Sequence, residues 1–360
     1  MHEGINALAD NALGITCLSR NSIHAPSHKL CYTNVVPNVL IGSLKDRIAL
    51  VGPTASGKTA VGILLAQRLG AEIVSADSMQ VYRHMDIGTA KPSADEQRQA
   101  VFHAVNVTDP SDDWTLADFQ RLGDTASSES AGRGQVPLIV GGTGLYVRAL
   151  TTRLDIPVAP PNEILRQSWR EFAETHGNPA LLAEVAKIDP ETAARLHVND
   201  IGRQIRALEV YAATGRTLTA LHAENQASQS AESPQMFGLR FADRELLYKR
   251  INRRVDKMIA DGLQAEVESL LNASYSATLK PMQSLGYRHM TAFLAGNTDW
   301  DTMIETLKQD TRRFAKRQMI WFRSDPRIHW LDADGLTAEQ LADTISPSIQ
   351  SSRQGASETL

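Results

Sequence analysis

Short apolar runs alternate with segments of helical period over residues 47–152. The runs RIALV, AEIVSAD and VPLIV have the length and the branched side chains of buried strands, and FHAVNVTDP suggests a further strand. AVGILLAQRL and TLADFQRL, which lie between these runs, have the apolar spacing of helices that cover a sheet. Because strands that alternate with helices form a parallel sheet with crossover helices, this region predicts an α/β fold.

The strand pattern stops at about residue 153 and resumes near residue 226. Three helices are predicted there, over PPNEILRQSWREFAETHG, PALLAEVAKIDPETAARLH and NDIGRQIRALEVYAATG. The third should have Asn199 or Asp200 as its N-cap and end at Gly215. MFGLRF then predicts a strand that returns to the sheet. We therefore expect a P-loop NTPase-like parallel-sheet core, formed by 47–152 and 226–335, with an all-helical insertion at 153–225.

The two ends of the chain lack this organisation. Residues 1–46 have no sustained helical or strand period, and we interpret them as a flexible N-terminal extension or as the product of an upstream start codon. For residues 336–360 we expect a C-terminal helix and a disordered tail, because SPSIQSSRQGASETL (346–360) is polar and of low complexity.

Composition narrows the possible functions. The net charge of −4 creates no overall field that would attract nucleic acid, so such binding requires a local basic patch. No apolar run approaches the roughly 18 residues of a membrane span. Cys17 and Cys31 are the two cysteines, and both precede residue 47. A cysteine nucleophile, a cysteine-ligated zinc site and a disulfide framework are therefore excluded from the rest of the chain, which favours a cytoplasmic protein with no membrane partner.

The segment GPTASGKT directly follows the first predicted strand and matches the phosphate-binding pattern G-x-x-x-x-G-K-[ST]. Its residues are Gly52, Pro53, Thr54, Ala55, Ser56, Gly57, Lys58 and Thr59. Glycines allow backbone N–H groups to approach phosphate oxygens, Lys58 supplies a cation, and Thr59 at the helix N-terminus can bind Mg²⁺. The loop predicts a bound chain of phosphates, but it does not identify the molecule that carries them.

Two further candidates follow predicted strands. Asp77 ends the second strand and could be a Mg²⁺ ligand, a general base or the cap of a turn. Gly141–Gly144 follows VPLIV, where its glycines either permit close approach of a ligand or form a tight turn, and Thr143 adds a hydroxyl. Since ligands of parallel sheets bind at the carboxyl ends of strands, Lys58, Asp77 and Thr143 are expected in one crevice.

Basic residues cluster in three places. Arg244–Lys257 has six Lys and Arg against two acids, and Arg312–Arg323 has five and no acid. Arg203 and Arg206 are three residues apart and share a helix face. Each cluster alone is typical of a solvated surface, but three of them in a chain of net charge −4 favour a polyanionic partner. Trp321 and Phe322 could stack on bases or lie in the core.

Together these segments resemble the tRNA dimethylallyltransferases, which attach an isopentenyl group to the adenosine immediately 3′ of the anticodon. The resemblance covers about residues 47–330, and its segments occur in the family's order. They are GPTASGKT, DSMQVYRHMDIGTAKP, GGTGLYVRAL, NDIGRQIRALEVYAATG, RELLYKRINRRVDKMIADGL, SLGYR and AKRQMIWFR. GPTASGKT is shared with many nucleotide enzymes, whereas the combination of the second, third and last segments is specific.

The resemblance implies a substrate and roles for several residues. The loop would hold the diphosphate of dimethylallyl diphosphate, with Mg²⁺ bound through Thr59. Asp77 would be the catalytic base that takes a proton from the exocyclic amine of adenine. Arg254 and Lys58 would neutralise the departing diphosphate. Thr143 would contact the acceptor amine or shape the channel.

The implied partner is the anticodon stem-loop of tRNA. The implied tRNA-binding residues are Asp77, Ser78, Met79, Gln80, Thr143, Arg166, Gly202, Arg203, Gln204, Ile205, Arg206, Gln283, Ser284, Leu285, Gly286, Tyr287 and Arg288. The segment DSMQ would hold an adenine extruded from its stack, and the helical insertion would grip the stem-loop. We expect the protein to be a monomer. Because the cysteine-free body lacks the zinc finger of eukaryotic members, we also expect an enzyme of the bacterial type.

Some positions depart from the family pattern. In FHAVNVTDP, His103 is retained, but Val105 and Asn106 replace the expected Ile and Asp, so we assign no catalytic role to this segment. Gln283 stands where some relatives carry Arg.

Three alternatives remain open. An adenylate isopentenyltransferase would use the same donor on free AMP, ADP or ATP, but it needs neither a helical insertion nor basic helices. A small-metabolite kinase would bind ATP in the loop and use Asp77 to activate a hydroxyl. A non-catalytic RNA-binding protein would not need Lys58 and Asp77 together.

Overall fold

The computed structural model describes residues 43–152, 154, 156, 161–227 and 233–357. These residues divide into two compact units. The α/β unit comprises the described residues up to 152 and from 233 onward, and the helical unit comprises those from 154 to 227. No helix in the described part of the chain is both long enough and apolar enough to cross a membrane.

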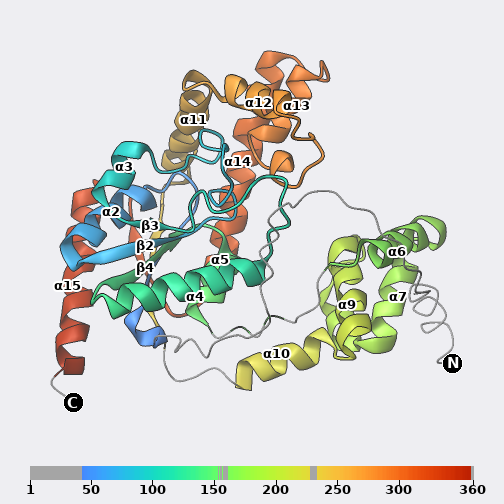
Figure 1. The fold of residues 1–360 in the computed structure, drawn as a ribbon, viewed down its shortest axis with the longest axis horizontal. Helices are drawn as coiled ribbons and strands as arrows, with labels where there is room; N and C mark the ends of the chain where they lie inside the picture. Colours follow the sequence, from blue (N-terminus) through green and yellow to red (C-terminus); the bar gives the residue numbers. More distant parts are fainter. Residues whose placement is uncertain (1–42, 153, 155, 157–160, 228–232, 358–360) are drawn as a thin grey trace, which may run out of the picture. The chain divides into compact units, whose positions relative to one another are not determined.

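One sheet of six parallel strands forms the centre of the α/β unit, in the order β3-β2-β4-β1-β5-β6 (Figure 1). The strands are β1 (Ile48–Val51), β2 (Ala71–Ala76), β3 (Phe102–His103), β4 (Val136–Gly141), β5 (Gln235–Arg240) and β6 (Ile328–Asp332). Gly141 pairs with Val51 of β1 and with Ala76 of β2. The three strands therefore end at the same level, and the segments that follow them start side by side. The predicted α/β fold with a P-loop-like parallel sheet is confirmed.

Helices cover both faces of this sheet (Figure 1). The helices of the α/β unit are, in chain order, α2 (Lys58–Leu69), α3 (Ala94–Gln99), α4 (Leu116–Gly132), α5 (Gly144–Thr151), α11 (Arg244–Ala260), α12 (Leu263–Asn272), α13 (Tyr287–Leu294), α14 (Trp300–Arg323) and α15 (Ala338–Ser357), with 3₁₀ turns at Leu44–Asp46 and Pro281–Gln283. Those that lie on the faces of the sheet are α2, α4, α5, α14 and α15. Along β1, Ile48 and Leu50 pack with α2 and α15, whereas Ala49 and Val51 pack with α4, α5 and α14. This alternation gives a three-layer core.

The helical unit contains α6 (Glu163–His176), α7 (Asn178–Ile188), α8 (Pro190–Arg195), α9 (Ile201–Thr214) and α10 (Leu218–Ala227). Its core centres on Trp169, Leu181 and Leu208. The predicted limits of α9 are confirmed, because Asp200 caps its first turn and Gly215 follows it in a left-handed conformation.

One expectation from the sequence is wrong, one holds over a shorter segment than expected, and one strand was not expected. PALLAEVAKIDPETAARLH forms two helices rather than one, because Asp189 ends α7 and caps α8 at Pro190. FHAVNVTDP contributes a strand of only two residues, since Ala104 and Asn106 adopt positive φ angles directly after it. The strand β6 was not foreseen.

The polar tail was also expected to be disordered from residue 346, but α15 continues to Ser357. Leu341, Ile345 and Ile349 recur at helical spacing and are buried against α2 and the sheet. The packing of these three side chains stabilises α15, which the polar composition of the segment did not indicate.

Replacing Ile349 with alanine should lower the free energy of unfolding by about 2 kcal/mol, because it removes a fully buried side chain. Gln350→Ala changes the next, exposed position and serves as the matched control. Urea unfolding followed by circular dichroism measures both variants. Equal stabilities would contradict the packed end of α15.

Candidate active site

The phosphate loop lies between β1 and α2, as the motif requires. Gly57 precedes the helix with φ +93°, a conformation that glycine adopts without strain. Lys58 Nζ donates a hydrogen bond of 2.7 Å to the carbonyl oxygen of Pro53. Arg250 Nε donates to Ala55 O at 2.8 Å, so α11 contributes a cation that supports the loop from outside.

The turn after β2 holds Asp77 beside the loop. Asp77 Oδ1 accepts a hydrogen bond from the N–H of Met79 at 2.9 Å, so the carboxylate caps this turn. Thr143 Oγ1 accepts from the N–H of Ser78 at 3.0 Å, and Thr143 N donates to Ala76 O at 3.1 Å. The ends of β2 and β4 are thereby joined at the level of the two side chains.

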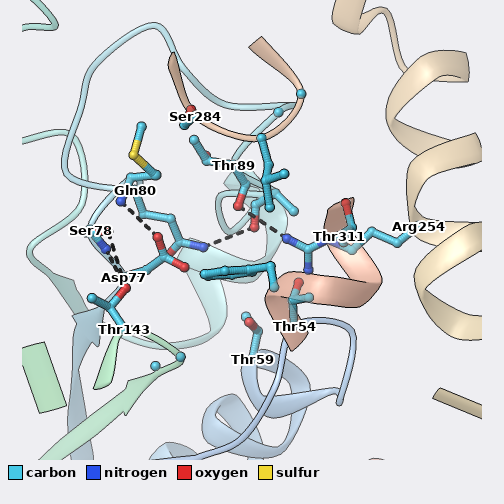
Figure 2. Close-up of a pocket in the computed structure, with 18 of the residues that line it drawn as sticks. Thr54, Thr59, Asp77, Ser78, Gln80, Thr89, Thr143, Arg254, Ser284 and Thr311 are labelled. Carbon is cyan, nitrogen blue, oxygen red and sulfur yellow. Dashed lines mark hydrogen bonds between the residues drawn. The ribbon is translucent and has the colours of Figure 1, made fainter. Parts of the chain in front are cut away.

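A cavity of about 360 Å³ opens at this end of the sheet. Figure 2 shows Asp77 and Thr143 on one side of it, Arg254 of α11 on the other, and Thr54 and Thr59 of the phosphate loop below. Of the residues that the sequence singled out, those lining the cavity are Thr54, Lys58, Thr59, Asp77, Ser78, Met79, Gln80, Thr143, Arg254, Ser284, Leu285, Gly286 and Arg288. The structure thus brings together the expected crevice of Lys58, Asp77 and Thr143.

Two cations face the one carboxylate across this cavity. Burial is the main cause that lowers the pKa of Lys58 to about 7, the Arg254 cation adds to the effect, and the Asp77 carboxylate opposes it. Burial likewise lowers the pKa of Arg254, again against Asp77. Arg254 also donates a hydrogen bond of 3.4 Å to Thr89 O. A cavity that crowds two cations at its edge is suited to a multiply charged anion.

Gln318 of α14 is a residue of this site that the sequence did not reveal. Its Oε1 accepts from the N–H of Thr54 at 2.8 Å, and its Nε2 donates to Gly142 O at 2.9 Å. One buried amide therefore bridges the phosphate loop and the glycine turn after β4. In the sequence it lies within the basic run RRFAKRQMIWFR and the family segment AKRQMIWFR, neither of which assigned it a role.

The cavity has the donors for a Mg²⁺ ion that binds together with phosphate. Thr59 and Asp77 both line it, and Mg²⁺ usually takes one or two protein oxygens while phosphates and water complete its shell. Within the described residues there is no group of three or more His, Cys, Asp or Glu side chains that would bind a metal alone. Thr59 and Asp77 are therefore the residues of the cavity that could contribute oxygen ligands to Mg²⁺.

The other candidates of the α/β unit have different surroundings. Tyr287 is fully buried, so its side chain lies out of reach of a macromolecule, and Gln283 Nε2 donates to Ala277 O at 2.6 Å. Phe322 belongs to the core, whereas Trp321 is 42% exposed. In the segment that departs from the family pattern, Asn106 Oδ1 accepts from Lys91 Nζ at 2.6 Å.

In the helical unit, the buried carboxylate of Glu209 organises the candidate arginines. Arg166 binds it through Nε at 2.8 Å and Nη2 at 3.0 Å, and Arg206 Nη1 lies 2.6 Å from Oε2. These contacts hold the pKa of Glu209 below its usual value although burial opposes them. Gly202 and Arg203 are exposed, whereas the side chains of Gln204 and Ile205 are buried inside the unit.

Comparisons with known proteins agree with this site. A family model described as IPP transferase matches residues 80–325, and one described as isopentenyl transferase matches residues 46–101. The tRNA dimethylallyltransferase of Geobacter metallireducens is 47% identical over 294 residues, which cover 81% of this chain and 94% of that protein. The tRNA dimethylallyltransferase 1 of Citrifermentans bemidjiense is 46% identical over 299 residues, which cover 83% and 95%.

Solved structures give the same picture. The full-length tRNA isopentenylpyrophosphate transferase of Bacillus halodurans is 37% identical, with a TM-score of 0.63, and the match covers 86% of this chain and 99% of that one. A eukaryotic dimethylallyltransferase acting on tRNA is 27% identical, with a TM-score of 0.71, and the match covers 86% and 80%.

The pKa of Lys58 leads to a pH dependence. At a pKa of about 7 the amine is protonated below neutral pH and neutral above it, and a bound diphosphate favours the protonated form. The affinity for pyrophosphate should therefore fall by about tenfold per pH unit above 7, relative to a Lys58→Arg variant whose cation does not titrate. Isothermal titration calorimetry between about pH 6.5 and 8.5 measures both proteins. If the affinities of the two proteins changed in parallel with pH, Lys58 would not be the group that loses its charge above about pH 7.

Proposed function

This chain belongs to the IPP transferase family of tRNA dimethylallyltransferases, which transfer a dimethylallyl group to tRNA, and we propose that it acts on N6 of the adenosine immediately 3′ of the anticodon. The donor is dimethylallyl diphosphate, and the products are N6-isopentenyladenosine and diphosphate. The observation that carries the proposal is the cavity in which Asp77 and Thr143 lie beside the phosphate loop and opposite Arg254. Family membership itself confirms the resemblance drawn from the motifs.

The phosphate loop and its neighbours hold the donor. Backbone N–H groups of the loop bind the diphosphate at the N-terminus of α2, and Lys58 exchanges its hydrogen bond with Pro53 O for one with a phosphate oxygen. Arg254 lies across the cavity, where negative charge grows as the C–O bond breaks. Mg²⁺, held through Thr59, would neutralise further charge on the same leaving group.

Asp77 activates the acceptor. The exocyclic amine of adenine is a weak nucleophile because its lone pair is delocalised into the ring. As the new N–C bond forms at the allylic carbon, the carboxylate takes the N–H proton, and the electron pair of the breaking C–O bond leaves with diphosphate. General base catalysis of this kind contributes about 10²–10⁴-fold in rate. Thr143 lies beside Asp77 and orients the amine or shapes its entry path.

The acceptor base must leave its stack to reach this cavity. Gln80 lies deep in it, where its Oε1 accepts from Ser75 Oγ at 2.8 Å and its Nε2 donates to Ala90 O at 3.2 Å. The remaining lone pair of Oε1 and the second N–H of Nε2 would contact the base. Ser284 and Arg288 line the cavity, and the exposed Arg288 would contact the anticodon loop. In the helical unit, the exposed Arg203 is placed to bind backbone phosphates of the stem-loop.

The remaining expectations are part of the proposal. The protein acts as a monomer in the cytoplasm. Transfer to free AMP, ADP or ATP is the less favoured alternative, because the relatives and solved structures compared above act on tRNA by name. A small-metabolite kinase is disfavoured for the same reason.

One assay separates these possibilities. The protein is incubated with Mg²⁺ and dimethylallyl diphosphate, with either unmodified tRNA or AMP, and nucleosides are analysed by mass spectrometry. N6-isopentenyladenosine in tRNA digests, at the position 3′ of the anticodon, is the expected product. Prenylated AMP without prenylated tRNA would overturn the proposal.

Asp77→Asn should reduce the transfer rate by at least about a hundredfold, because the amide keeps the size of the side chain and an acceptor for Met79 N–H but cannot take a proton. Affinity for tRNA should stay within about twofold of wild type, since the amide oxygen still accepts hydrogen bonds, and affinity for pyrophosphate should not fall, since a neighbouring negative charge is removed. Single-turnover kinetics with filter binding measures both quantities. A near-normal rate would show that Asp77 is not the base.

A further inference from the structure

One carboxylate outside the cavity organises its wall. Glu266 of α12 accepts hydrogen bonds from three consecutive backbone N–H groups: Oε2 from Asp86 and Ile87, both at 2.8 Å, and Oε1 from Gly88 at 3.1 Å. Tyr287 donates its hydroxyl to Oε1 at 2.6 Å. Four donors converge on one anionic side chain, and hydrogen bonds to an ionised acceptor are among the strongest in proteins.

The segment held in this way, the 86–90 loop, contacts both sides of the active site. The carbonyl oxygen of Thr89 accepts from Arg254 at 3.4 Å, and that of Ala90 accepts from Gln80 Nε2 at 3.2 Å. Figure 2 shows Gln80 and Arg254 reaching towards this loop from different elements. A shift of the loop would therefore move the hydrogen-bond acceptors of both side chains at once. Arg254 is the side chain proposed to contact the diphosphate, and Gln80 is the one proposed to contact the base.

Tyr287 contacts both Glu266 and the 86–90 loop. Its side chain is fully buried, and a Cβ atom on Gly88 would lie 2.5 Å from the ring, so ring and loop are packed without space between them. Burial among apolar atoms and the Glu266 carboxylate raise the pKa of Tyr287, which keeps its hydroxyl protonated as a donor. Its neighbours Gly286 and Arg288 line the cavity, whereas the Tyr287 side chain is fully buried.

We propose that Glu266 and Tyr287 are positioning residues, which fix the 86–90 loop and through it orient Arg254 towards diphosphate and Gln80 towards the acceptor base. This inference rests on the proposed function for the identity of the two ligands. It assigns to Tyr287, implied by the resemblance to be a tRNA contact, an indirect role carried out through Glu266.

Glu266→Gln tests the proposal with little change of shape. One acceptor oxygen becomes an NH₂ group that meets backbone N–H donors, so the loop is released from part of its contacts. Since a misplacement of about 1 Å can cost on the order of 10²-fold in rate, transfer to tRNA should fall about 10- to 100-fold in kcat/KM. Tyr287→Phe removes one hydrogen bond and keeps the ring, and should cost about fivefold.

Glu268→Gln is the matched control. Glu268 lies on the same helix, its Oε1 accepts from Gln264 Nε2 at 2.8 Å, and it makes no contact with the 86–90 loop. Its kinetics should remain within about twofold of wild type. Thermal unfolding of all variants verifies that they are folded. A loss in Glu268→Gln equal to that in Glu266→Gln would mean that any change in α12 is harmful, and would overturn the proposal.

A double-mutant cycle distinguishes positioning from general damage. If Glu266 acts through Arg254, Glu266→Gln should weaken pyrophosphate binding about fivefold in the wild-type background and less than about twofold in an Arg254→Ala background. The parallel cycle with Gln80→Ala uses KM for tRNA. Equal losses in both backgrounds, or no loss in either, would overturn the inference.

The two proposals fail in different ways. Pyrophosphate binding requires no reaction, so its cycle decides the role of Glu266 even if the wild-type protein transfers no dimethylallyl group to tRNA. A wild-type protein that transfers no dimethylallyl group to tRNA would instead overturn the proposed function.

Discussion

The whole site depends on the common end of three parallel strands. Gly141 pairs with Val51 and with Ala76, and a Cβ atom on it would lie 2.1 Å from Ala76 O. Only glycine permits this approach, because any side chain would push β2 and β4 apart. The phosphate loop starts directly after β1, Asp77 directly follows β2, and Thr143 lies two residues after the end of β4. Their distances are therefore set by sheet register rather than by flexible side chains.

A second constraint is electrostatic. Two hydrogen bonds fix the phosphate loop. Lys58 donates to Pro53 O, and the N–H of Thr54 donates to Gln318 of α14. These contacts hold the loop in one conformation, so the proposed binding of a diphosphate would require less ordering. Arg254 lies opposite, where burial lowers its pKa and the Asp77 carboxylate opposes this shift. In the proposed reaction, binding and departure of the diphosphate would therefore change the charge balance around Asp77.

Much of this could be predicted from the sequence, because strands, the phosphate loop and the strand-end residues have local patterns. Gln318 and Glu266 could not, since their partners lie far away in the chain; Gln318 and Thr54 are 264 residues apart. The end of α15 was missed because three buried apolar residues outweigh a polar composition. Gln204 and Tyr287 show a further limit: a motif identifies a functional segment but not which of its side chains point inward.

The most direct test is a crystal structure with a non-reactive thiolodiphosphate analogue of the donor and an anticodon stem-loop. The account predicts diphosphate in the phosphate loop, the target adenine out of its stack, and N6 at hydrogen-bonding distance, about 3 Å, from the Asp77 carboxylate. An adenine that stays stacked in the loop, or a diphosphate bound away from Lys58 and Arg254, would contradict it.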